Sequence, residues 1–344
     1  MVAALLRRLR RLGVRAERRL TLLLAPLLSW RSLGADRRAL SRALEALERS
    51  GFIEYTGEFG AEITTFVPFV HWLKQQGHLE GRRVLTYRGM RPYYFFLSDD
   101  EYEEKSARRC WLPPADRTWP TSSTYTATRR PWRRPVDYRT RYASSSPGAD
   151  RPLLFIQNKF TVEWNVGPVN FMPIGSLETL FSYSEDRFDV VYSRAVNGRS
   201  VRQFTPDHSL DCNYPDLELA RERFPRVRIL EDICAETGAP YNELKLEILA
   251  RSHLFAAVQG GGSHLLACFP NSVLLLLHVD GQEYPHAYAA GPYKHLADPP
   301  PLLLLARTPD EFQQGAELLG LLEVRDGRVR TPPDAGRQLK ALRF

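Results

Sequence analysis

The second half of the chain alternates short apolar segments with helical ones, and this alternation constrains the fold more than any other feature. Strands are expected at Leu153–Gln157, Asp189–Ser193, Val227–Leu230, Leu254–Gln259, Val273–His278 and Leu302–Ala306. Helices are expected at Ser176–Tyr183, Pro215–Phe224, Asn242–Ser252, Ser263–Phe269 and Pro309–Leu319. Apolar strands that alternate with helices form a parallel sheet covered on both faces. Residues 152–325 are therefore predicted to form a doubly wound, Rossmann-like domain.

A shorter stretch of the same kind lies earlier, at residues 51–106. It has expected strands at Phe52–Tyr55, Arg83–Tyr87 and Tyr93–Leu97 and an expected helix at Glu62–Gln76. The sequence thus predicts an α/β protein of two Rossmann-like domains, the first of them small. Residues 107–151 are rich in proline, arginine and serine, which indicates an interdomain linker, and residues 326–344 are expected to be a tail.

Residues 1–50 are predicted to be a basic helical extension, with 12 arginines against four acidic residues and leucines at helical spacing. A second helix is expected from Asp36 through Leu47. Residues 1–34 have two open interpretations. They either rest on an anionic membrane surface or pack on the main body with a solvated basic face.

The net charge of +7 is unevenly placed, because residues 1–50 contribute +8 and residues 107–151 contribute +7. The rest of the chain is therefore acidic, whereas a nucleic-acid-binding domain carries its basic patch on the fold itself. We expect no nucleic-acid partner. The four cysteines are scattered, and no apolar run approaches the roughly 18 residues needed to span a bilayer. These features predict a cytoplasmic protein, peripheral at the inner membrane face if residues 1–34 bind lipid.

The run Gln259-Gly260-Gly261-Gly262-Ser263-His264 follows an apolar strand and opens a helix. Three glycines let the backbone approach a ligand closely, and Ser263 is expected to cap the helix. Backbone N–H groups at such a point bind phosphate or diphosphate. The alternative, a tight turn that binds nothing, stays open. The run does not match the dinucleotide, serine-hydrolase or P-loop motifs.

Further polar residues follow the other expected strands. Lys159 lies just past the first strand, and Arg194 and Arg202 follow the second, where they are candidates for pairing with phosphate oxygens. Glu243 is a candidate acceptor for ribose hydroxyls, and Glu283 for sugar hydroxyls. Each cation taken singly also fits a solvated surface position. Glu243 also fits a first-turn acid that the helix dipole favours, and Glu283 a simple polar loop.

Several of these segments resemble bacterial GT-B type glycosyltransferases similar to those of polysaccharide and O-antigen clusters. The resemblance is carried by Gly57-Glu58-Phe59-Gly60, Gln157-Asn158-Lys159-Phe160 with Glu163-Trp164, Tyr241-Asn242-Glu243-Leu244-Lys245-Leu246, and Gln259–Ser263. It implies that a nucleotide-sugar donor binds the C-terminal domain with its diphosphate at the glycine-rich turn. It also implies that a carbohydrate or glycolipid acceptor approaches from the N-terminal domain.

An inverting transfer needs a base that takes the proton of the acceptor hydroxyl. Glu58, in the turn between the first strand and helix, is the candidate; Glu62 is the reserve, and His264 is a more distant choice. A retaining mechanism, which needs no such base, stays open.

The acidic run Asp99-Asp100-Glu101 follows an expected strand, as the metal-binding acids of a GT-A enzyme do. Because the nucleotide-binding half comes after this run, a solvated helix start is favoured. We expect neither a metal nor another cofactor. The alternatives to a glycosyltransferase are another nucleotide-sugar enzyme, such as an isomerase or epimerase, and a non-catalytic nucleotide-binding protein.

Overall fold

The chain divides into two compact units in the computed structural model. The structure describes residues 34, 37–106, 109, 119, 132, 135–143, 151–162, 167–194, 213–279, 292–325 and 327–330. Unit 1 comprises Met1–Val136, Gln282–Asp298 and Phe344, and unit 2 comprises Asp137–Gly281 and Pro299–Arg343. The change of unit thus lies at residue 137 instead of 152, and the chain returns to unit 1 at residue 282.

Unit 2 contains a six-stranded sheet in which every neighbouring pair is parallel. Its strands are β4 (Leu153–Asn158), β5 (Asp189–Arg194), β6 (Arg228–Ile229), β7 (Leu254–Val258), β8 (Val273–Leu277) and β9 (Leu302–Ala306). Their order is β6-β5-β4-β7-β8-β9. Numbered within the sheet this is 3-2-1-4-5-6, the doubly wound order that reverses between its first and fourth strands. The predicted parallel sheet is confirmed, and each strand agrees with its expected bounds to within one residue.

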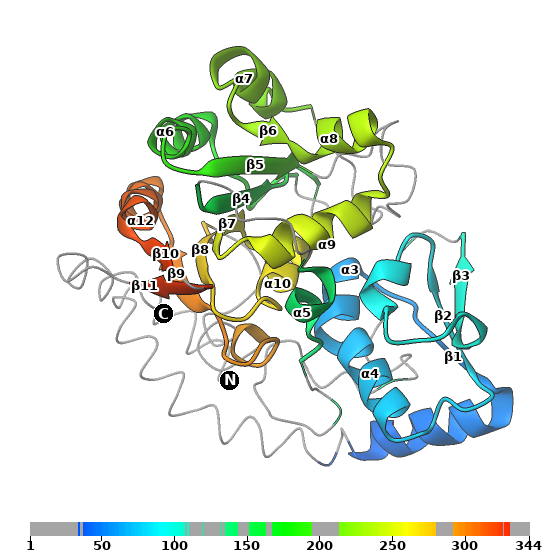
Figure 1. Cartoon of the computed structure of the whole chain (residues 1–344). Coiled ribbons are helices and arrows are strands. Elements are labelled where there is room, and N and C mark those ends of the chain that lie inside the picture. The colour runs from blue at the N-terminus through cyan, green and yellow to red at the C-terminus, as the bar shows by residue number, and fades with distance from the viewer. Residues whose placement is uncertain are drawn as a thin grey trace. The chain divides into compact units, whose positions relative to one another are not determined.

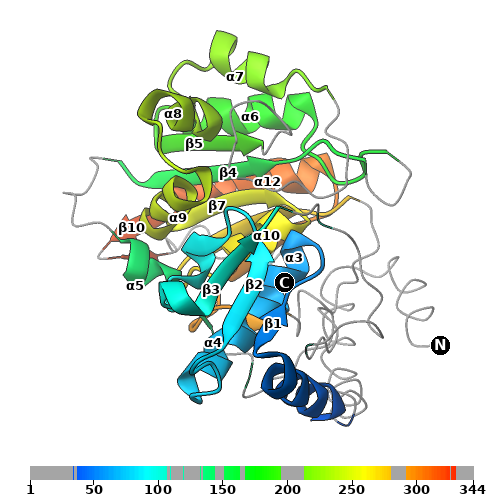
Figure 2. The same cartoon turned by 90° about the vertical axis from the view of Figure 1, so that its right-hand side faces the viewer.

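Helices cover both faces of this sheet (Figures 1 and 2). They are α5 (Tyr138–Tyr142), α6 (Ile174–Ser184), α7 (Asp216–Arg223), α8 (Leu230–Thr237), α9 (Tyr241–Arg251), α10 (Gly261–Leu266) and α12 (Pro309–Leu321). Helix α6 packs against α7 and α12 on one side, and α8 packs against α9 on the other. A hairpin of β10 (Glu323–Arg325) and β11 (Arg328–Arg330) follows, so an antiparallel strand lies where a tail was expected.

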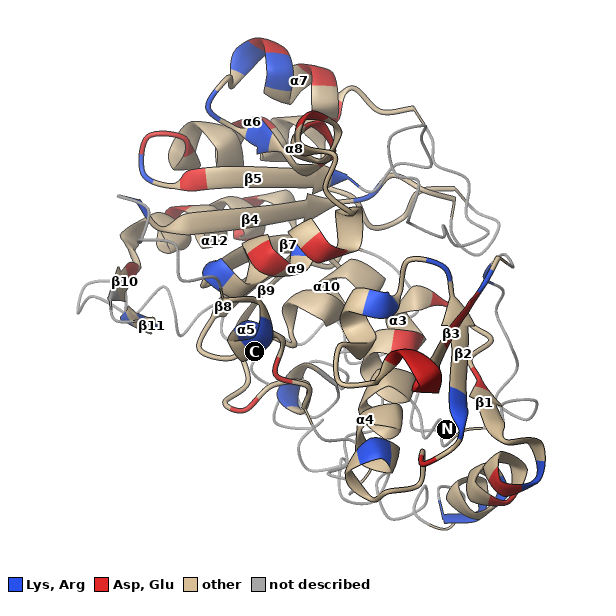
Figure 3. Cartoon of the chain, turned by 45° about the vertical axis from the view of Figure 1, so that its right-hand side comes forward, with Lys and Arg blue, Asp and Glu red and all other residues tan. Residues whose placement is uncertain are grey.

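The apolar strands form because both of their faces are covered. All five residues of β7 and of β8 are buried, and side chains from both strands enter one core with α6 and α12. Acidic and basic residues are interspersed along α7 and α9 instead of gathering on one helix (Figure 3).

Unit 1 contains a three-stranded parallel sheet in the order β1-β2-β3. Its elements are β1 (Phe52–Glu54), α3 (Phe59–Ala61), the π-helical turn η2 (Glu62–Phe66), α4 (Val67–Gln75), β2 (Arg83–Tyr87), the 3₁₀ turns η3 (Arg91–Tyr94) and η4 (Asp99–Glu101), and β3 (Tyr102–Lys105), with η6 (Pro292–Lys294) from the returning segment. Residues 37–50 form a helix that buries Ala43 and Leu47. The α/β class is therefore confirmed in both units.

The third strand of unit 1 lies elsewhere than expected. Tyr93–Leu97 is not a strand, because Pro92 begins a 3₁₀ turn that directs Tyr93 and Tyr94 into the core. The third strand is β3, whose sequence Tyr-Glu-Glu-Lys has no apolar alternation. Edge strands are commonly charged, since charges discourage pairing with other chains. The expected helix start at Asp99–Glu101 is present as a 3₁₀ turn.

The expected linker contributes to both units. Arg109, Trp119 and Trp132 are buried in unit 1, while α5 belongs to unit 2. In α5, Arg139 donates hydrogen bonds to the carbonyls of Ala250 (2.6 Å) and Ser252 (2.8 Å), at the C-terminal end of α9. A cation is favourable there, because the last carbonyls of a helix have no acceptor role inside it. Among the residues that the structure describes, no helix is long and apolar enough to cross a membrane.

Residues 1–33, 35 and 36 lie outside the described residues, so the membrane hypothesis for residues 1–34 stays a prediction.

The contact between α12 and β8 gives a stability prediction. A Cβ on Gly315 would lie 2.3 Å from Leu275 Cδ1. We expect Gly315→Ala to lower the free energy of unfolding by about 1–3 kcal/mol, the usual effect of overpacking a core. Gly320→Ala in the same helix is the control, because its Cβ would meet only the flexible end of Arg187. Thermal denaturation that leaves Gly315→Ala as stable as Gly320→Ala would contradict this packing.

Candidate functional site

The carboxyl ends of β4 and β7 lie side by side where the winding of the sheet reverses. The two strands pair in parallel register up to Gln157 and Ala257. The segment Gln157–Lys159 therefore ends beside the segment Gln259–Gly262, which we call the glycine loop. Ligands of doubly wound folds bind at this switch point.

At two glycines of this loop, a Cβ would collide with the end of a side chain from the last residues of β4 or just after it. A Cβ on Gly262 would lie 2.1 Å from Gln157 Nε2, and a Cβ on Gly260 would lie 2.8 Å from Lys159 Nζ. Gly260 also has φ 148°, a region that residues with a side chain rarely adopt. The structure therefore brings Lys159 close to Gly260, with Gly262 beside Gln157, while the donor site expected there stays a prediction.

The loop closes on itself through Ser263. Its hydroxyl donates to the Gly260 carbonyl (2.8 Å) and accepts the Gly260 N–H (3.2 Å). Helix α10 begins at Gly261, so Gly260 is its N-cap and Ser263 lies in its first turn. The expected capping by Ser263 thus takes the form of a bond back to the cap residue. His264 is buried. The N–H groups of Gly261 and Gly262 lie in the first turn, where the helix itself offers no acceptor.

Buried amides tie the segment after β4 to this site. Asn158 Oδ1 accepts the Met172 N–H (2.8 Å), and Asn170 donates to Gln259 Oε1 (2.8 Å). Gln157 Oε1 is buried and accepts no hydrogen bond from any residue that the structure describes. Sequence reasoning missed Asn170 and Gln259 as parts of the site. The signal for Gln259 was a polar residue ending a fully apolar strand.

Arg194 does not take the expected position beside a phosphate. Its side chain is 5% exposed, and its Nε lies 2.9 Å from Asp216 Oδ1, while Tyr192 donates to the other oxygen of Asp216. Burial raises the pKa of Asp216 and of Tyr192. A buried arginine needs such a partner, because an unpaired charge is costly inside a fold. The prediction for Arg194 is therefore replaced by a structural ion pair.

Glu243 is exposed on α9, whereas Tyr241 and Lys245 of the same helix are buried. Beside them, Ser193 Oγ donates to Glu231 Oε1 (2.9 Å) and lies 3.0 Å from the Tyr241 hydroxyl. Burial lowers the pKa of Lys245 to about 8 and raises the pKa of Glu231. The buried charged residue of α9 is therefore Lys245, whereas the residue selected from the sequence, Glu243, is exposed.

Arg202 and Glu283 lie outside the described residues.

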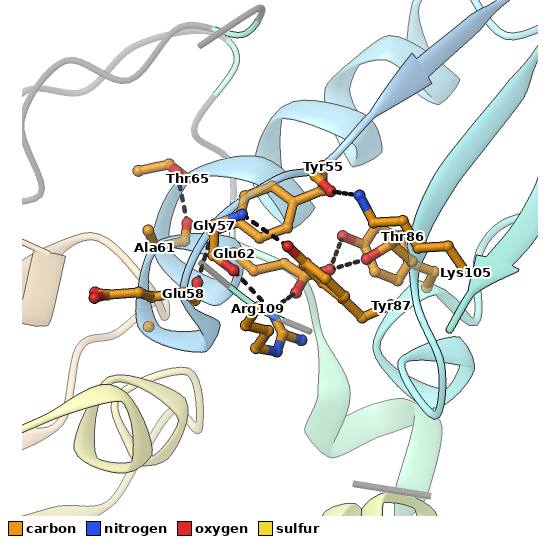
Figure 4. Close-up of polar contacts among 12 residues, drawn as sticks. Tyr55, Gly57, Glu58, Ala61, Glu62, Thr65, Thr86, Tyr87, Lys105 and Arg109 are labelled. Carbon is orange, nitrogen blue, oxygen red and sulfur yellow. Dashed lines mark hydrogen bonds and ion pairs between the residues drawn. The ribbon is translucent and has the colours of Figure 1, made fainter. Parts of the chain in front are cut away.

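The turn that carries Glu58 is held through its backbone in unit 1 (Figure 4). The Gly57 N–H donates to the Tyr87 hydroxyl (3.2 Å), and the Tyr55 hydroxyl donates to the Glu58 carbonyl (2.6 Å). Arg109 Nη1 donates a hydrogen bond to the Gly57 carbonyl (3.4 Å). Glu58 is the N-cap of α3, is half-buried, and makes no side-chain cap bond. The backbone position of Glu58 is therefore set by Tyr55, Tyr87 and Arg109.

Glu62 is completely buried, with 0% of its side chain exposed. One oxygen accepts hydrogen bonds from Tyr94 (2.8 Å) and Thr86, and the other lies 2.6 Å from Arg109 Nη1. Burial, together with the Glu62 charge, raises the pKa of Tyr94. Glu62 offers a substrate no exposed oxygen, so its contacts support a structural role in place of the expected reserve base.

The acidic run of unit 1 matches the solvated helix start. Asp99 and Asp100 are exposed, Asp99 pairs with Arg91 (2.9 Å), and Glu101 pairs with Lys74 (2.6 Å). Within the described ranges, no three histidine, cysteine or acidic side chains gather in a metal-binding group. Independence of metal stays an expectation about the reaction.

Comparisons with known proteins add little. No protein-family model matches the chain, and no curated protein matches it. Among solved structures, the chain is similar to the glycosyl transferase family 9 from Veillonella parvula DSM 2008, with 10% identity and a TM-score of 0.40 over 78% of this chain and 88% of that chain. A likeness at this level does not establish a shared function, so the assignment depends on the geometry of the site.

The buried pair in unit 1 gives a second stability prediction. Arg109→Met leaves the Glu62 carboxylate buried without its cation, so we expect a loss of about 3–5 kcal/mol in unfolding free energy. The double variant Glu62→Met with Arg109→Met should lose less, because no charge remains buried. Urea denaturation measures both.

The control is Arg83→Met. Its pair with Glu103 has side chains that are 64% and 54% exposed, so the change should hardly alter stability. Equal effects of Arg83→Met and Arg109→Met would contradict the structural role of the buried pair.

Proposed function

We propose that the protein is a glycosyltransferase of the GT-B type. It would move a sugar from a nucleotide-sugar to a hydroxyl of a carbohydrate or glycolipid acceptor, in polysaccharide or glycoconjugate biosynthesis. The observation that carries the proposal is the meeting of Lys159 with the glycine loop at the switch point of a 3-2-1-4-5-6 sheet.

The chemistry of this meeting suits a diphosphate. The Lys159 ammonium neutralises phosphate charge, and the N–H groups of Gly261 and Gly262 donate to phosphate oxygens. The buried Gln157 Oε1 is suited to accept a hydrogen bond from a hydroxyl group of the nucleotide-sugar. The segment after β4 has no G-x-G-x-x-G run, which argues against a nicotinamide or flavin dinucleotide despite the strand order.

In the proposed reaction the acceptor oxygen bonds to the anomeric carbon as the bond from that carbon to the diphosphate oxygen breaks. Negative charge then grows on the departing diphosphate. Lys159 and the two N–H groups stabilise this charge more strongly in the transition state than in the bound donor. For this step a lysine supplies positive charge without a metal ion.

Glu58 is the proposed base that takes the proton of the acceptor hydroxyl in an inverting transfer. Tyr55, Tyr87 and Arg109 fix the backbone of its turn. A general base must lie within hydrogen-bonding distance of the proton that it removes. A base on a fixed turn is held at that distance more often than a base on a mobile one.

The donor site predicts a ligand-induced rise in melting temperature. Among UDP-, GDP-, CMP- and dTDP-sugars, the true donor should stabilise the wild type by about 2.7 kcal/mol at 100 times its Kd. Lys159→Ala and Gly260→Ala should remove this shift, the first by loss of charge and the second by strain and displacement of Lys159. Gly175→Ala in α6 is the control, because nothing lies within 4 Å of its Cβ.

A folded Gly260→Ala protein that keeps the full shift would exclude the glycine loop as the donor site. Product analysis with the stabilising donor then separates transfer to an acceptor from isomerisation of the sugar.

The proposed base predicts a selective loss of turnover. Glu58→Gln keeps the shape of the side chain but takes up no proton at neutral pH, so kcat should fall by about 10²–10⁴. The Kd of the donor should stay unchanged, because the donor binds unit 2. Glu48→Gln, at an exposed position of helix 37–50, is the control. Near-normal turnover by Glu58→Gln would eliminate this base and favour a retaining mechanism.

A further inference from the structure

Three aromatic side chains from separate segments meet at the carboxyl edge of the sheet in unit 2. Phe160 follows β4, Phe171 precedes α6, and Tyr214 precedes α7. All three are half-buried. We call them the aromatic platform. Phe160 closes the run Gln157-Asn158-Lys159-Phe160, but none of the three rings has a role in the proposed donor site.

The platform is a flat stack flanked at its edge. Phe160 and Tyr214 are stacked, with ring centroids 4.2 Å apart and an interplanar angle of 15°. Phe171 is nearly perpendicular to both, at 4.8 Å from Phe160 and 5.6 Å from Tyr214. A ring covering the outer face of one partner would lie much farther from the other partner. Phe171 therefore lies beside the stack and leaves its outer faces uncovered by these three rings.

The stack is tied to β4, the strand that ends just before Lys159. The Tyr214 hydroxyl donates to the Met172 carbonyl (3.0 Å), and the Met172 N–H donates to Asn158 Oδ1 (2.8 Å). Because Asn158 ends β4, the orientation of the Tyr214 ring is fixed relative to the sheet. An oriented ring loses little conformational freedom when it stacks on a ligand.

Consecutive residues lead from the phosphate site to the platform. The Lys159 ammonium lies beside Gly260, and the next residue, Phe160, stacks on Tyr214. A ligand whose diphosphate contacts Lys159 thus has a flat aromatic surface one residue away. A planar nucleobase extends a parallel stack of rings, since every base presents a π face to such a surface.

We propose that the aromatic platform binds the nucleobase of the donor, so that the nucleotide extends from the glycine loop on β7 past β4 toward β5. The proposal rests on the proposed donor site for the position of the diphosphate. It adds the side on which the base lies and the contact that selects a nucleotide over a bare diphosphate.

Isothermal titration with UDP, GDP, dTDP, CMP, the corresponding nucleotide-sugars and inorganic diphosphate tests the platform. Phe160→Leu and Tyr214→Leu keep apolar volume but remove a π face. Each should weaken the best nucleotide about tenfold or more, the usual loss when a stacking ring is removed. The Kd of inorganic diphosphate should not change, whereas Lys159→Ala should weaken both probes. Tyr183→Leu, at a half-buried tyrosine of α6, is the matched control.

The outcomes are distinguishable. Unchanged nucleotide affinity in both folded leucine variants overturns the platform while leaving the phosphate site intact. A loss confined to the nucleotide-sugar, with the free nucleotide unaffected, assigns the rings to the sugar and also overturns it. A wild type that binds neither nucleotide nor diphosphate refutes the proposed function, and the platform with it.

Discussion

At residues 260 and 262 the glycine loop has no room for a Cβ unless the ends of the Lys159 and Gln157 side chains move. A Cβ at residue 262 would lie 2.1 Å from the Gln157 amide, and a Cβ at residue 260 would lie 2.8 Å from the Lys159 ammonium. The present positions of the Gln157 amide and the Lys159 ammonium depend on the absence of these Cβ atoms. Larger residues would displace Gln157 and Lys159 and separate the cation from the backbone N–H groups that the proposal assigns to the diphosphate.

A different device fixes the turn of Glu58 in unit 1. Glu62 and Arg109 are almost wholly buried and pair at 2.6 Å, although removing two charges from water is unfavourable. Arg109 also contacts the Gly57 carbonyl and lies over the Tyr87 ring, 4.3 Å from its centroid. The hydroxyl of that same tyrosine accepts the Gly57 N–H. We interpret the buried pair as a means of holding this turn in one geometry, which the base proposed at Glu58 would require.

The sheet of unit 2 was predictable because its strands have apolar cores that alternate with helices, and β7, β8 and β9 are apolar throughout. The edge strand β3 was not, because Tyr-Glu-Glu-Lys carries no apolar pattern. Sequence placed Lys159 and the glycine loop at the two strand ends that do meet. That prediction follows from connectivity, since the carboxyl ends of parallel strands share one edge of the sheet.

Side-chain partners were less predictable. Nothing local indicates that Arg194 pairs with Asp216, which lies 22 positions further along the chain. On α9, Tyr241, Lys245 and Leu249 share one buried face at a spacing of four residues. That periodicity is the signal that would have selected Lys245 as buried in place of Glu243. The spacing alone does not select Lys245, because the sequence does not show which face of α9 meets the sheet.

The most direct test of the central claim is a crystal structure with the nucleoside diphosphate that binds most tightly. The account predicts diphosphate oxygens within hydrogen-bonding distance of Lys159 Nζ and of the N–H groups of Gly261 or Gly262. A diphosphate bound elsewhere in the protein, with the glycine loop making no contact to it, would contradict the account.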